Sequence, residues 1–295
     1  MVLVYPLVKK ILMIINNLTL SSSDSITLAA TIYQANPCSN KTVLINSGTG
    51  ILRRYYDGFA QFLCAHGFTV VTYDYRGIGG SCPKSLRGFP ATMRDWGQND
   101  IAGVIAWITA NLRPAKLFII GHSAGGQVAG LAANIDLVNA MVFVAAQSGY
   151  WRHWPFPRRY WYACLWHATP LIANVFGYLP SRRLGIGQDL PRGVACEWAK
   201  WCRHPQYLFG YGQTLDLTHY ASFTGPILAY SFADDSDAPA AAVDALLRGY
   251  SGALIVRKHI APASVNARRI DHFGLFRERF RDTLWRDTVM WLEGQ

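Results

Sequence analysis

Ser123 lies at the centre of the segment GHSAG (residues 121–125), whose residue types can present a hydroxyl group as a nucleophile. The apolar run KLFII (116–120) precedes it and a run of small residues follows it, which predicts a strand turning sharply into a helix at the serine. Glycines two positions before and two after the serine relieve backbone crowding at such a turn. Free N–H groups at the start of the helix would face developing negative charge. This context favours a nucleophile over an incidental serine in a glycine-rich packing turn.

A serine hydroxyl needs a base, and that base needs an acid to orient it. In a strand–turn–helix architecture both follow the serine in the chain, the acid first and the histidine second. His272 lies in the loop RRIDHFGLF before the last expected helix, whereas His259 lies inside an expected strand and should pack or face solvent. We therefore predict that His272 is the base.

Three aspartates compete for the role of the acid. Asp234, Asp235 and Asp237 all follow the apolar run PILAYSF (226–232). Asp235 lies where the strand should end, Asp234 would point the other way if the strand continued, and Asp237 could cap the following helix. We predict Asp235, with Asp234 and Asp237 as the alternatives.

The negative oxygen formed by serine attack needs two N–H donors. One donor should come from the residue after the nucleophile, Ala124, and the other from the loop after the apolar run TVLIN (42–46). That loop reads NSGTGI (46–51), and the N–H of Thr49 is our choice within it. A plain strand-to-helix turn would have a similar sequence.

The elements that must position these residues follow a repeated pattern of an apolar run, a glycine-bearing turn and an amphipathic stretch. The apolar runs are TVLIN (42–46), FTVVTYD (68–74), KLFII (116–120), AMVFVAA (140–146), PILAYSF (226–232) and ALIVRKHI (253–260). Runs without polar alternation predict parallel strands buried on both faces by helices. The segment NLTLSSSDSITLAATIYQ alternates instead and predicts an antiparallel hairpin at the sheet edge. The last helix should bury Phe276, Phe280 and Leu284.

About eighty residues separate AMVFVAA from PILAYSF, which is too long for a simple crossover. We predict a core of residues 1–147 and 214–295 and a mostly helical, aromatic and basic cap of residues 148–213. The stretch from 150 to 213 holds six of the ten tryptophans, and eight basic residues against two acidic ones. Such a segment would lie over the carboxyl ends of the strands, where open α/β sheets bind ligands.

Composition limits the class of protein and the kinds of cofactor and partner that the chain could have. The 295 residues are 51% hydrophobic and 16% charged, which favours one large core over disorder. The six cysteines contain no CxxC pair, so we expect buried thiols in a reducing, cytoplasmic setting. Cys196, Cys202 and His204 cluster without a fourth ligand at a familiar spacing, and we predict no metal. The net charge of +10 comes without a nucleic-acid recognition motif, and we predict no nucleic-acid partner.

The N-terminal segment MVLVYPLVKKILMII is apolar but is split by two lysines. It is shorter than the ~20 residues of a membrane span, and its charges do not fit a signal peptide. We expect a leading strand or residues from an over-long start, with weak contact to a membrane surface as the alternative.

Taken together, these motifs resemble those of the α/β-hydrolase superfamily over nearly the whole chain. YDYRGIGGS (73–81), GHSAGG, DDSDAP and DHFG resemble, in the same order, its arginine–glycine loop, its nucleophile elbow, its acid turn and its histidine loop. YDYRGIG, GHSAGGQ and QSGYWRHWP also resemble a bacterial group of predicted hydrolases. Two positions depart from the pattern: Asp271 precedes the histidine where relatives often carry glycine, and the oxyanion loop lacks an HG start.

The resemblance implies an α/β-hydrolase fold, with about eight strands and a helical cap inserted after the sixth strand. It also implies a serine hydrolase that cleaves an ester, thioester or amide through an acyl-enzyme and needs no cofactor. The aromatic cap favours an apolar acyl or aryl ester as the substrate. The alternatives are a non-catalytic binding protein on this fold, or a serine-dependent lyase, acyltransferase or peptidase. The sequence does not indicate an oligomeric state.

Overall fold

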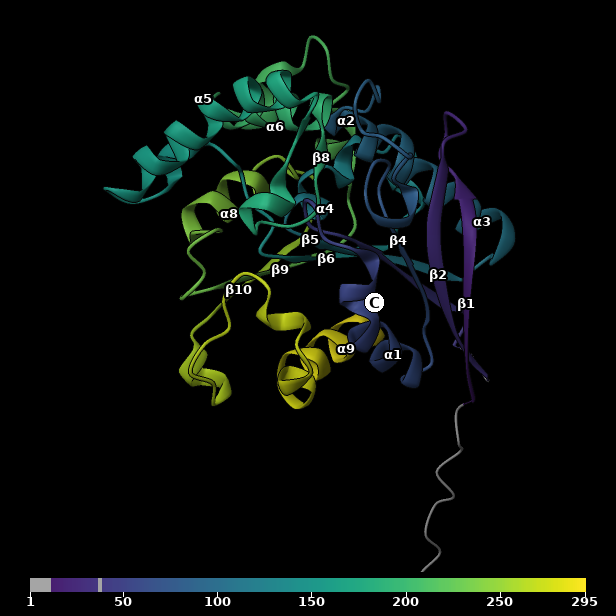
Figure 1. The fold of residues 1–295 in the computed structure, drawn as a ribbon. Coiled ribbons are helices and arrows are strands. Elements are labelled where there is room, and N and C mark those ends of the chain that lie inside the picture. The colour runs from purple at the N-terminus through teal and green to yellow at the C-terminus, as the bar shows by residue number, and fades with distance from the viewer. Residues whose placement is uncertain (1–11, 37–38) are drawn as a thin grey trace, which may run out of the picture.

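The computed structural model describes residues 12–36 and 39–295, and an eight-stranded sheet forms its centre (Figure 1). In spatial order the strands are β1 (Leu12–Ser21), β2 (Thr27–Asn36), β4 (Thr69–Tyr73), β3 (Lys41–Asn46), β5 (Lys116–His122), β6 (Ala140–Val144), β9 (Ile227–Phe232) and β10 (Ile255–Ile260). β2 pairs antiparallel with both β1 and β4, and the later neighbours all pair in parallel. The predicted sheet, mostly parallel with an antiparallel hairpin at one edge, is confirmed.

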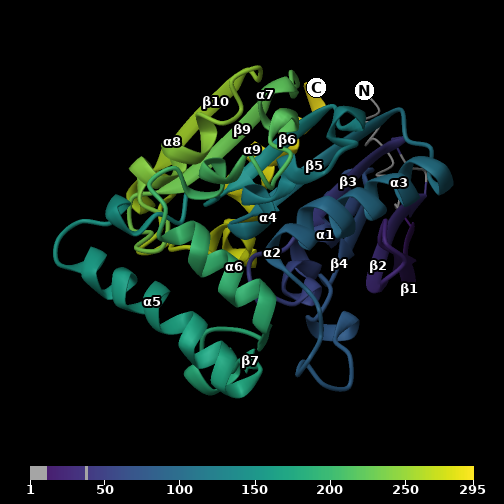
Figure 2. The same cartoon turned by 90° about the horizontal axis from the view of Figure 1, so that it is seen from above.

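Helices cover both faces of this sheet. They are α1 (Asp57–Ala65), α2 (Met93–Asp95), α3 (Ala102–Asn111), α4 (Ala124–Gln127), α8 (Ala240–Leu247) and α9 (Arg286–Glu293). α1 and α9 lie together on one side, where the buried Trp285 packs against Phe59 and Phe62 of α1, and α3, α4 and α8 lie on the other (Figures 1 and 2). All residues of β4, β6 and β9 are buried, which explains their unbroken apolar sequences.

Residues 145–226 connect β6 to β9 and are referred to below as the insert. The insert contains α5 (Arg158–Phe176), α6 (Arg192–Cys202), α7 (Thr218–Ser222) and the short antiparallel pair β7 (Tyr178–Leu179) and β8 (Leu190–Pro191). α5 packs on α6 and projects from the body of the molecule (Figure 2). None of the helices in the described ranges is both long and apolar enough to cross a membrane.

Side chains of α6 attach the insert to the rest of the chain. The Glu197 carboxylate accepts hydrogen bonds from the backbone N–H (2.8 Å) and the Nε (2.6 Å) of Arg94 in α2. Trp198 donates to the hydroxyl of Tyr207 (3.1 Å), which donates to Gln127 Oε1 (2.7 Å) at the end of α4. These contacts fix α6 beside the helix that follows Ser123.

Two predicted helices differ from the structure. α4 spans only four residues after Ser123 before a 3₁₀ turn. Near the C-terminus Arg277 has an extended backbone (φ −81°, ψ 139°), which interrupts the expected single helix. Phe276, Phe280 and Leu284 are still buried there, in two 3₁₀ turns and a π-helical turn that precede α9. Most of the predicted leading strand, residues 1–11, lies outside the described residues.

Candidate active site

Ser123 joins β5 to α4 in a strained backbone conformation. Its φ of 49° and ψ of −115° are unusual for a residue with a side chain and are typical of functional turns. A methyl group at position 125 would collide with the backbone carbonyl of Asn46 in β3, and one at position 121 would lie 2.7 Å from the backbone nitrogen of Gly126. Gly125 therefore allows the turn to pack against β3, and Gly121 allows the turn to close on Gly126.

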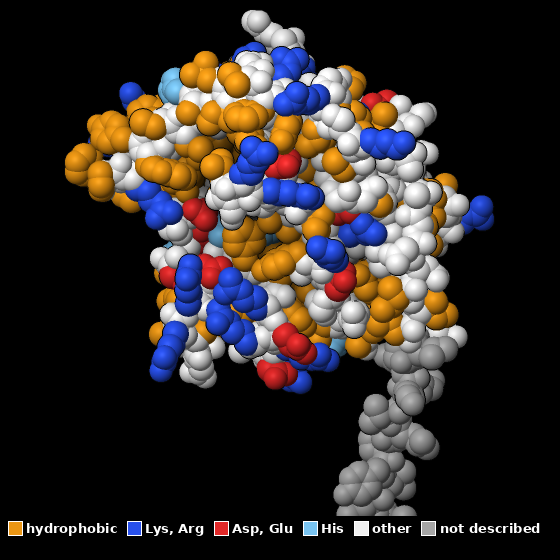
Figure 3. All heavy atoms as spheres, in the orientation of Figure 1, with side chains coloured by type: hydrophobic (Ala, Val, Ile, Leu, Met, Phe, Trp, Pro, Cys, Tyr) orange, Lys and Arg blue, Asp and Glu red, His pale blue; other side chains and the backbone are white. Residues whose placement is uncertain are grey.

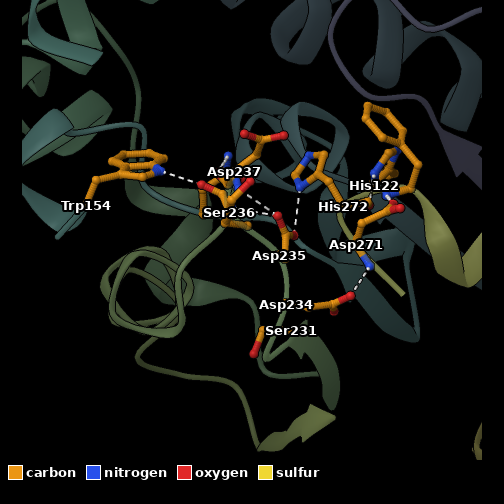
Figure 4. A network of polar contacts seen from close by, with 12 residues as sticks. His122, Trp154, Ser231, Asp234, Asp235, Ser236, Asp237, Asp271 and His272 are labelled. Atoms are coloured by element: carbon orange, nitrogen blue, oxygen red, sulfur yellow. Dashed lines mark hydrogen bonds and ion pairs between the residues drawn. The ribbon is translucent and has the colours of Figure 1, made fainter. Parts of the chain in front are cut away.

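His272 and Asp235 form a buried hydrogen-bonded pair (Figure 4). The distance between His272 Nδ1 and Asp235 Oδ2 is 2.8 Å, and the Asp235 side chain has no exposed surface. Its other oxygen, Oδ1, accepts the backbone N–H groups of Asp237 (2.8 Å) and Ala238 (3.0 Å). Both carboxylate oxygens of Asp235 thus have fixed partners.

The alternative acids contact other groups. Asp234 Oδ2 accepts the backbone N–H groups of Ile270 (2.8 Å) and Asp271 (3.1 Å) and so holds the loop that carries the histidine. Asp237 Oδ1 accepts the hydroxyl hydrogen of Tyr162 (2.7 Å) in α5. The exposed His259 contacts Ser231 on β9, at 2.6 Å from Nδ1 to Oγ. Of the three aspartates, Asp235 is the one that contacts the His272 imidazole.

The Asp235–His272 pair shifts both pKa values. Burial alone would lower the pKa of His272, but the negative charge of Asp235 and its hydrogen bond outweigh burial and raise it above the ordinary value. Burial likewise disfavours the charged carboxylate of Asp235. Its charge attraction to His272 and its hydrogen bonds nevertheless lower the pKa. This environment favours an ionised aspartate beside the imidazole and holds the proton on Nδ1, which leaves Nε2 as the nitrogen for a reacting group.

Ser123 and His272 line one cavity, but no hydrogen bond connects the Ser123 hydroxyl to the imidazole in the described structure. Hydrogen bonds of this kind are often long without substrate and shorten in the reacting complex. The cavity, rather than a direct bond, is what brings the two side chains together here.

The predicted oxyanion loop forms a tight turn in which the Ile51 N–H donates to the Gly48 carbonyl (3.1 Å). The Gly48 N–H donates to the hydroxyl of Tyr56 (2.9 Å). Among the hydrogen bonds of the described residues, the Thr49 N–H has no partner, and Thr49 lines the cavity. Ala124 begins α4, where backbone N–H groups lack helical partners. Neither predicted donor N–H group is therefore used in a hydrogen bond among the described residues, and their role as oxyanion donors remains a prediction.

A buried link joins the turn at residues 48–51 to the histidine loop, and no sequence pattern indicated it. His122 Nε2 lies 3.0 Å from the backbone oxygen of His272, and a carbonyl only accepts, so Nε2 carries the hydrogen. His122 Nδ1 therefore accepts from the Tyr56 hydroxyl (2.8 Å), which accepts from the Gly48 N–H. Burial, with a further contribution from the charge of His272, lowers the pKa of His122 to about 3. A neutral His122 thus holds both loops.

Asp271 takes a left-handed backbone conformation with a φ of 60°. Glycine adopts this conformation easily, and aspartate is among the few other residues that tolerate it. The Asp271 carboxylate accepts the backbone N–H of Phe273 (2.9 Å) and pairs with Arg277 (3.0 Å), away from the imidazole. The departure from glycine noted in the sequence therefore leaves Asp235 as the partner of His272.

The cavity beside Ser123 has a volume of about 220 Å³ and is mainly apolar. Its aromatic and aliphatic lining comes largely from the insert and includes Trp154, Trp161, Tyr162, Leu165, Trp166 and Trp198. The insert also contacts the turn at residues 48–51 directly, because the N–H of Gln188 donates to the Gly50 carbonyl (2.8 Å). Across residues 12–36 and 39–295, no three His, Cys, Asp or Glu side chains gather into a set that could hold a metal ion.

The fold and the comparisons agree on the class of protein. The model of the alpha/beta hydrolase family matches residues 43–277, and the chain belongs to this family. A search of curated proteins gave no match.

Solved structures with the same fold include several esterases. An esterase of Pyrococcus furiosus is 15% identical with a TM-score of 0.61, covering 96% of this chain and 91% of its own. An esterase of Exiguobacterium antarcticum is 16% identical with a TM-score of 0.61, covering 94% of this chain and 100% of its own. The protein Est1E of Butyrivibrio proteoclasticus, solved with ferulic acid bound, has the same identity and TM-score and covers 94% of this chain and 98% of its own. At these levels of identity, the similarity shows that the chains share one fold.

Proposed function

We propose that this protein is a serine hydrolase that cleaves an ester or thioester of a largely apolar small molecule through an acyl-enzyme. The observation that carries the proposal is the buried 2.8 Å hydrogen bond between His272 and Asp235, at a cavity that Ser123 also lines. An imidazole paired with a carboxylate, next to a strained serine at a helix start, is the arrangement that activates a hydroxyl for acyl transfer.

In the proposed reaction Ser123 Oγ attacks the substrate carbonyl while His272 Nε2 takes the hydroxyl proton. The N–H groups of Thr49 and Ala124 stabilise the negative oxygen of the tetrahedral intermediate. His272 returns the proton to the leaving alcohol or thiol, and the acyl group remains on Ser123. Water, activated by the same imidazole, then releases the acid. Asp235 stays ionised throughout and stabilises the protonated imidazole.

We assign residues 148–213 as a cap over this site, with residues 1–147 and 214–295 as the core. The substrate preference for an apolar acyl or aryl group rests on the aromatic lining that the insert contributes to the cavity. The ferulic acid bound to the protein of Butyrivibrio proteoclasticus is an aromatic acid, which is consistent with this class of substrate.

A fluorophosphonate probe tests the nucleophile and the base together. Wild-type protein should become labelled, and Ser123→Ala should not. His272→Ala should abolish labelling, whereas the matched control His259→Ala should label normally, since His259 is exposed on β10. Labelling of Ser123→Ala, or equal loss in both histidine variants, would contradict the assignment.

A series of p-nitrophenyl esters of increasing acyl length tests the substrate class. The apolar lining predicts that kcat/KM rises from acetate to a longer chain before the cavity becomes limiting. If activity is absent at every length although Ser123 is labelled, thioesters become the next substrates to assay.

A further inference from the structure

Exposed apolar side chains are concentrated on the outer surface of the insert. More than half of the large hydrophobic residues exposed in the described chain lie between residues 156 and 186, and Figure 3 shows this accumulation over α5. This set, referred to as the outer face, consists of Phe156, Tyr160, Trp161, Leu171, Val175, Phe176, Leu184 and Ile186. Contiguous apolar surface of this kind marks a binding surface more often than a solvated one.

The geometry of α5 explains how the outer face arises. Tyr162, Trp166, Thr169 and Ala173 recur at helical spacing and are buried. Tyr160, Leu171 and Val175 lie on the opposite side, where Leu171 is 69% and Val175 is 80% exposed. A helix with one face on its own protein and a second apolar face outward needs a partner for that second face. The 19 residues of α5 extend over about 28 Å at 1.5 Å per residue.

Arginines border the outer face at both ends. From Trp151 to Gln188 the chain contains five arginines and no acidic residue. They are Arg152, Arg158 and Arg159 before or at the start of α5, and Arg182 and Arg183 after β7. In the described chain only Arg158 among them pairs its guanidinium with a carboxylate, that of Asp237 at 3.4 Å, on an exposed contact. The next acidic residue, Asp189, accepts the backbone N–H of Arg182 (2.9 Å) and forms no ion pair with a guanidinium among the described residues. The surface therefore combines apolar side chains with largely unpaired positive charge.

The outer face is continuous with the catalytic cavity. Trp161 and Ile186 are 59% and 56% exposed, and both also line the cavity that contains Ser123. A surface covering the outer face would thus lie directly at the entrance to the site.

We propose that the outer face docks on an anionic phospholipid bilayer, with its apolar side chains inserted at the interface and its arginines against the lipid phosphates. Tryptophan and tyrosine favour this interface, and arginines near an anionic leaflet add attraction. This binding is independent of the proposed hydrolysis. Delivery of an acyl ester from the bilayer to Ser123 rests on the proposed function.

Charge complementarity favours a bilayer over a second copy of the chain. In a two-fold contact along α5 the arginines at the ends of the helix would face those of the partner copy. Asp237 and Asp189 are the acidic residues beside them, and two carboxylates do not balance five arginines. An anionic leaflet instead supplies negative charge along the whole length of the helix.

Cosedimentation with sucrose-loaded vesicles tests the proposal with full-length protein carrying Ser123→Ala, so that lipids stay intact. The protein should sediment with vesicles of phosphatidylcholine and phosphatidylglycerol and much less with phosphatidylcholine alone. Leu171→Ser with Val175→Ser should lower the partition coefficient by at least about tenfold through lost apolar burial. The matched control, Leu254→Ser with Met290→Ser, changes equally exposed residues away from the insert and should bind like the parent.

A second variant tests the charge. Arg159→Gln with Arg183→Gln should weaken binding to the anionic vesicles by about fivefold for each arginine and leave binding to neutral vesicles unchanged. In the Ser123-containing background, neither double variant on the outer face should change kcat for a soluble short-chain ester, because Leu171, Val175, Arg159 and Arg183 do not line the cavity.

The proposal is overturned if the parent protein stays in the supernatant with anionic vesicles, or if the outer-face and control variants sediment alike. It is also overturned if sedimentation equilibrium shows a dimer that Leu171→Ser with Val175→Ser dissolves, since the outer face would then join two copies. Failure of hydrolysis in the soluble-ester assay would count against the proposed function alone and would leave the sedimentation result unaffected.

Discussion

Replacing Asp235 with asparagine tests the proposed chemistry most directly, because the structure dictates how the new amide must sit. Asp235 Oδ1 accepts two backbone N–H groups, from Asp237 and Ala238, and only the amide oxygen of asparagine can take that position. The NH₂ group is then placed where Oδ2 now faces His272 Nδ1 at 2.8 Å. Two donors cannot pair, so the imidazole must move its hydrogen to Nε2.

An imidazole with its hydrogen on Nε2 cannot accept the proton of Ser123. We expect Asp235→Asn to lower kcat by a factor on the order of 10⁴, as for the loss of the correct tautomer in a serine triad. That factor corresponds to about 5.4 kcal/mol of activation free energy. Because the variant keeps the two backbone hydrogen bonds, its fold should persist, and circular dichroism checks this.

The assay is kcat for a p-nitrophenyl ester at a pH where the wild-type rate is constant. Asp234→Asn is the matched control, since an amide oxygen can still accept the N–H groups of Ile270 and Asp271 and activity should remain near that of the wild type. The reasoning is refuted if Asp235→Asn keeps more than about a tenth of wild-type kcat. It is also refuted if Asp237→Asn shows the large loss instead.

Three further predictions concern the two buried histidines. The Asp235 carboxylate raises the pKa of His272, and only the neutral imidazole can act as a base. The plot of kcat/KM against pH should therefore fall on the acid side with a midpoint above pH 6.5. A midpoint below pH 6.5 would contradict the pairing of His272 with Asp235. Tyr56→Phe removes the hydrogen-bond partner of the Gly48 N–H and of His122 Nδ1. Urea unfolding should show that the free energy of unfolding decreases by about 2–4 kcal/mol. An unchanged unfolding midpoint would show that these two hydrogen bonds do not stabilise the protein. The pKa of His122 is about 3 in the native state, whereas the unfolded chain binds this proton below about pH 6.5, so the free energy of unfolding decreases as the pH is lowered. Between pH 6.5 and pH 5 the wild type should lose about 2 kcal/mol more stability than His122→Gln does. Equal pH dependence of the two proteins would argue against a buried neutral imidazole.

The centre of the sheet was predictable because its strands are buried on both faces. Continuous apolar runs such as those of β5, β6 and β9 leave few alternatives to a parallel sheet between helix layers. The sequence placed Asp235 at the strand exit, and in the structure this aspartate contacts His272, while the catalytic roles of both residues stay a prediction. Chain order and strand ends were sufficient to propose both residues as a pair.

The link between the two loops was not predictable, because Tyr56 and His122 are 66 positions apart and neither belongs to a spacing pattern that would connect them. The interruption of the C-terminal helix was not predicted for a different reason. Phe276 and Phe280 are buried as the four-residue period requires, but the period does not predict the extended backbone of Arg277, which separates the two 3₁₀ turns. Periodicity reports which side chains are buried and not whether the helix between them is continuous.

The hydrogen bond from the Gln188 N–H to the Gly50 carbonyl has a consequence for engineering. It joins the insert to the turn that carries Thr49, so the insert is not an exchangeable module on this scaffold. Grafting a foreign segment between β6 and β9 would leave the Gly50 carbonyl without its partner and release the turn. On the proposed role of Thr49 in holding the negative oxygen, a transplant without a backbone donor at that position should lower the reaction rate.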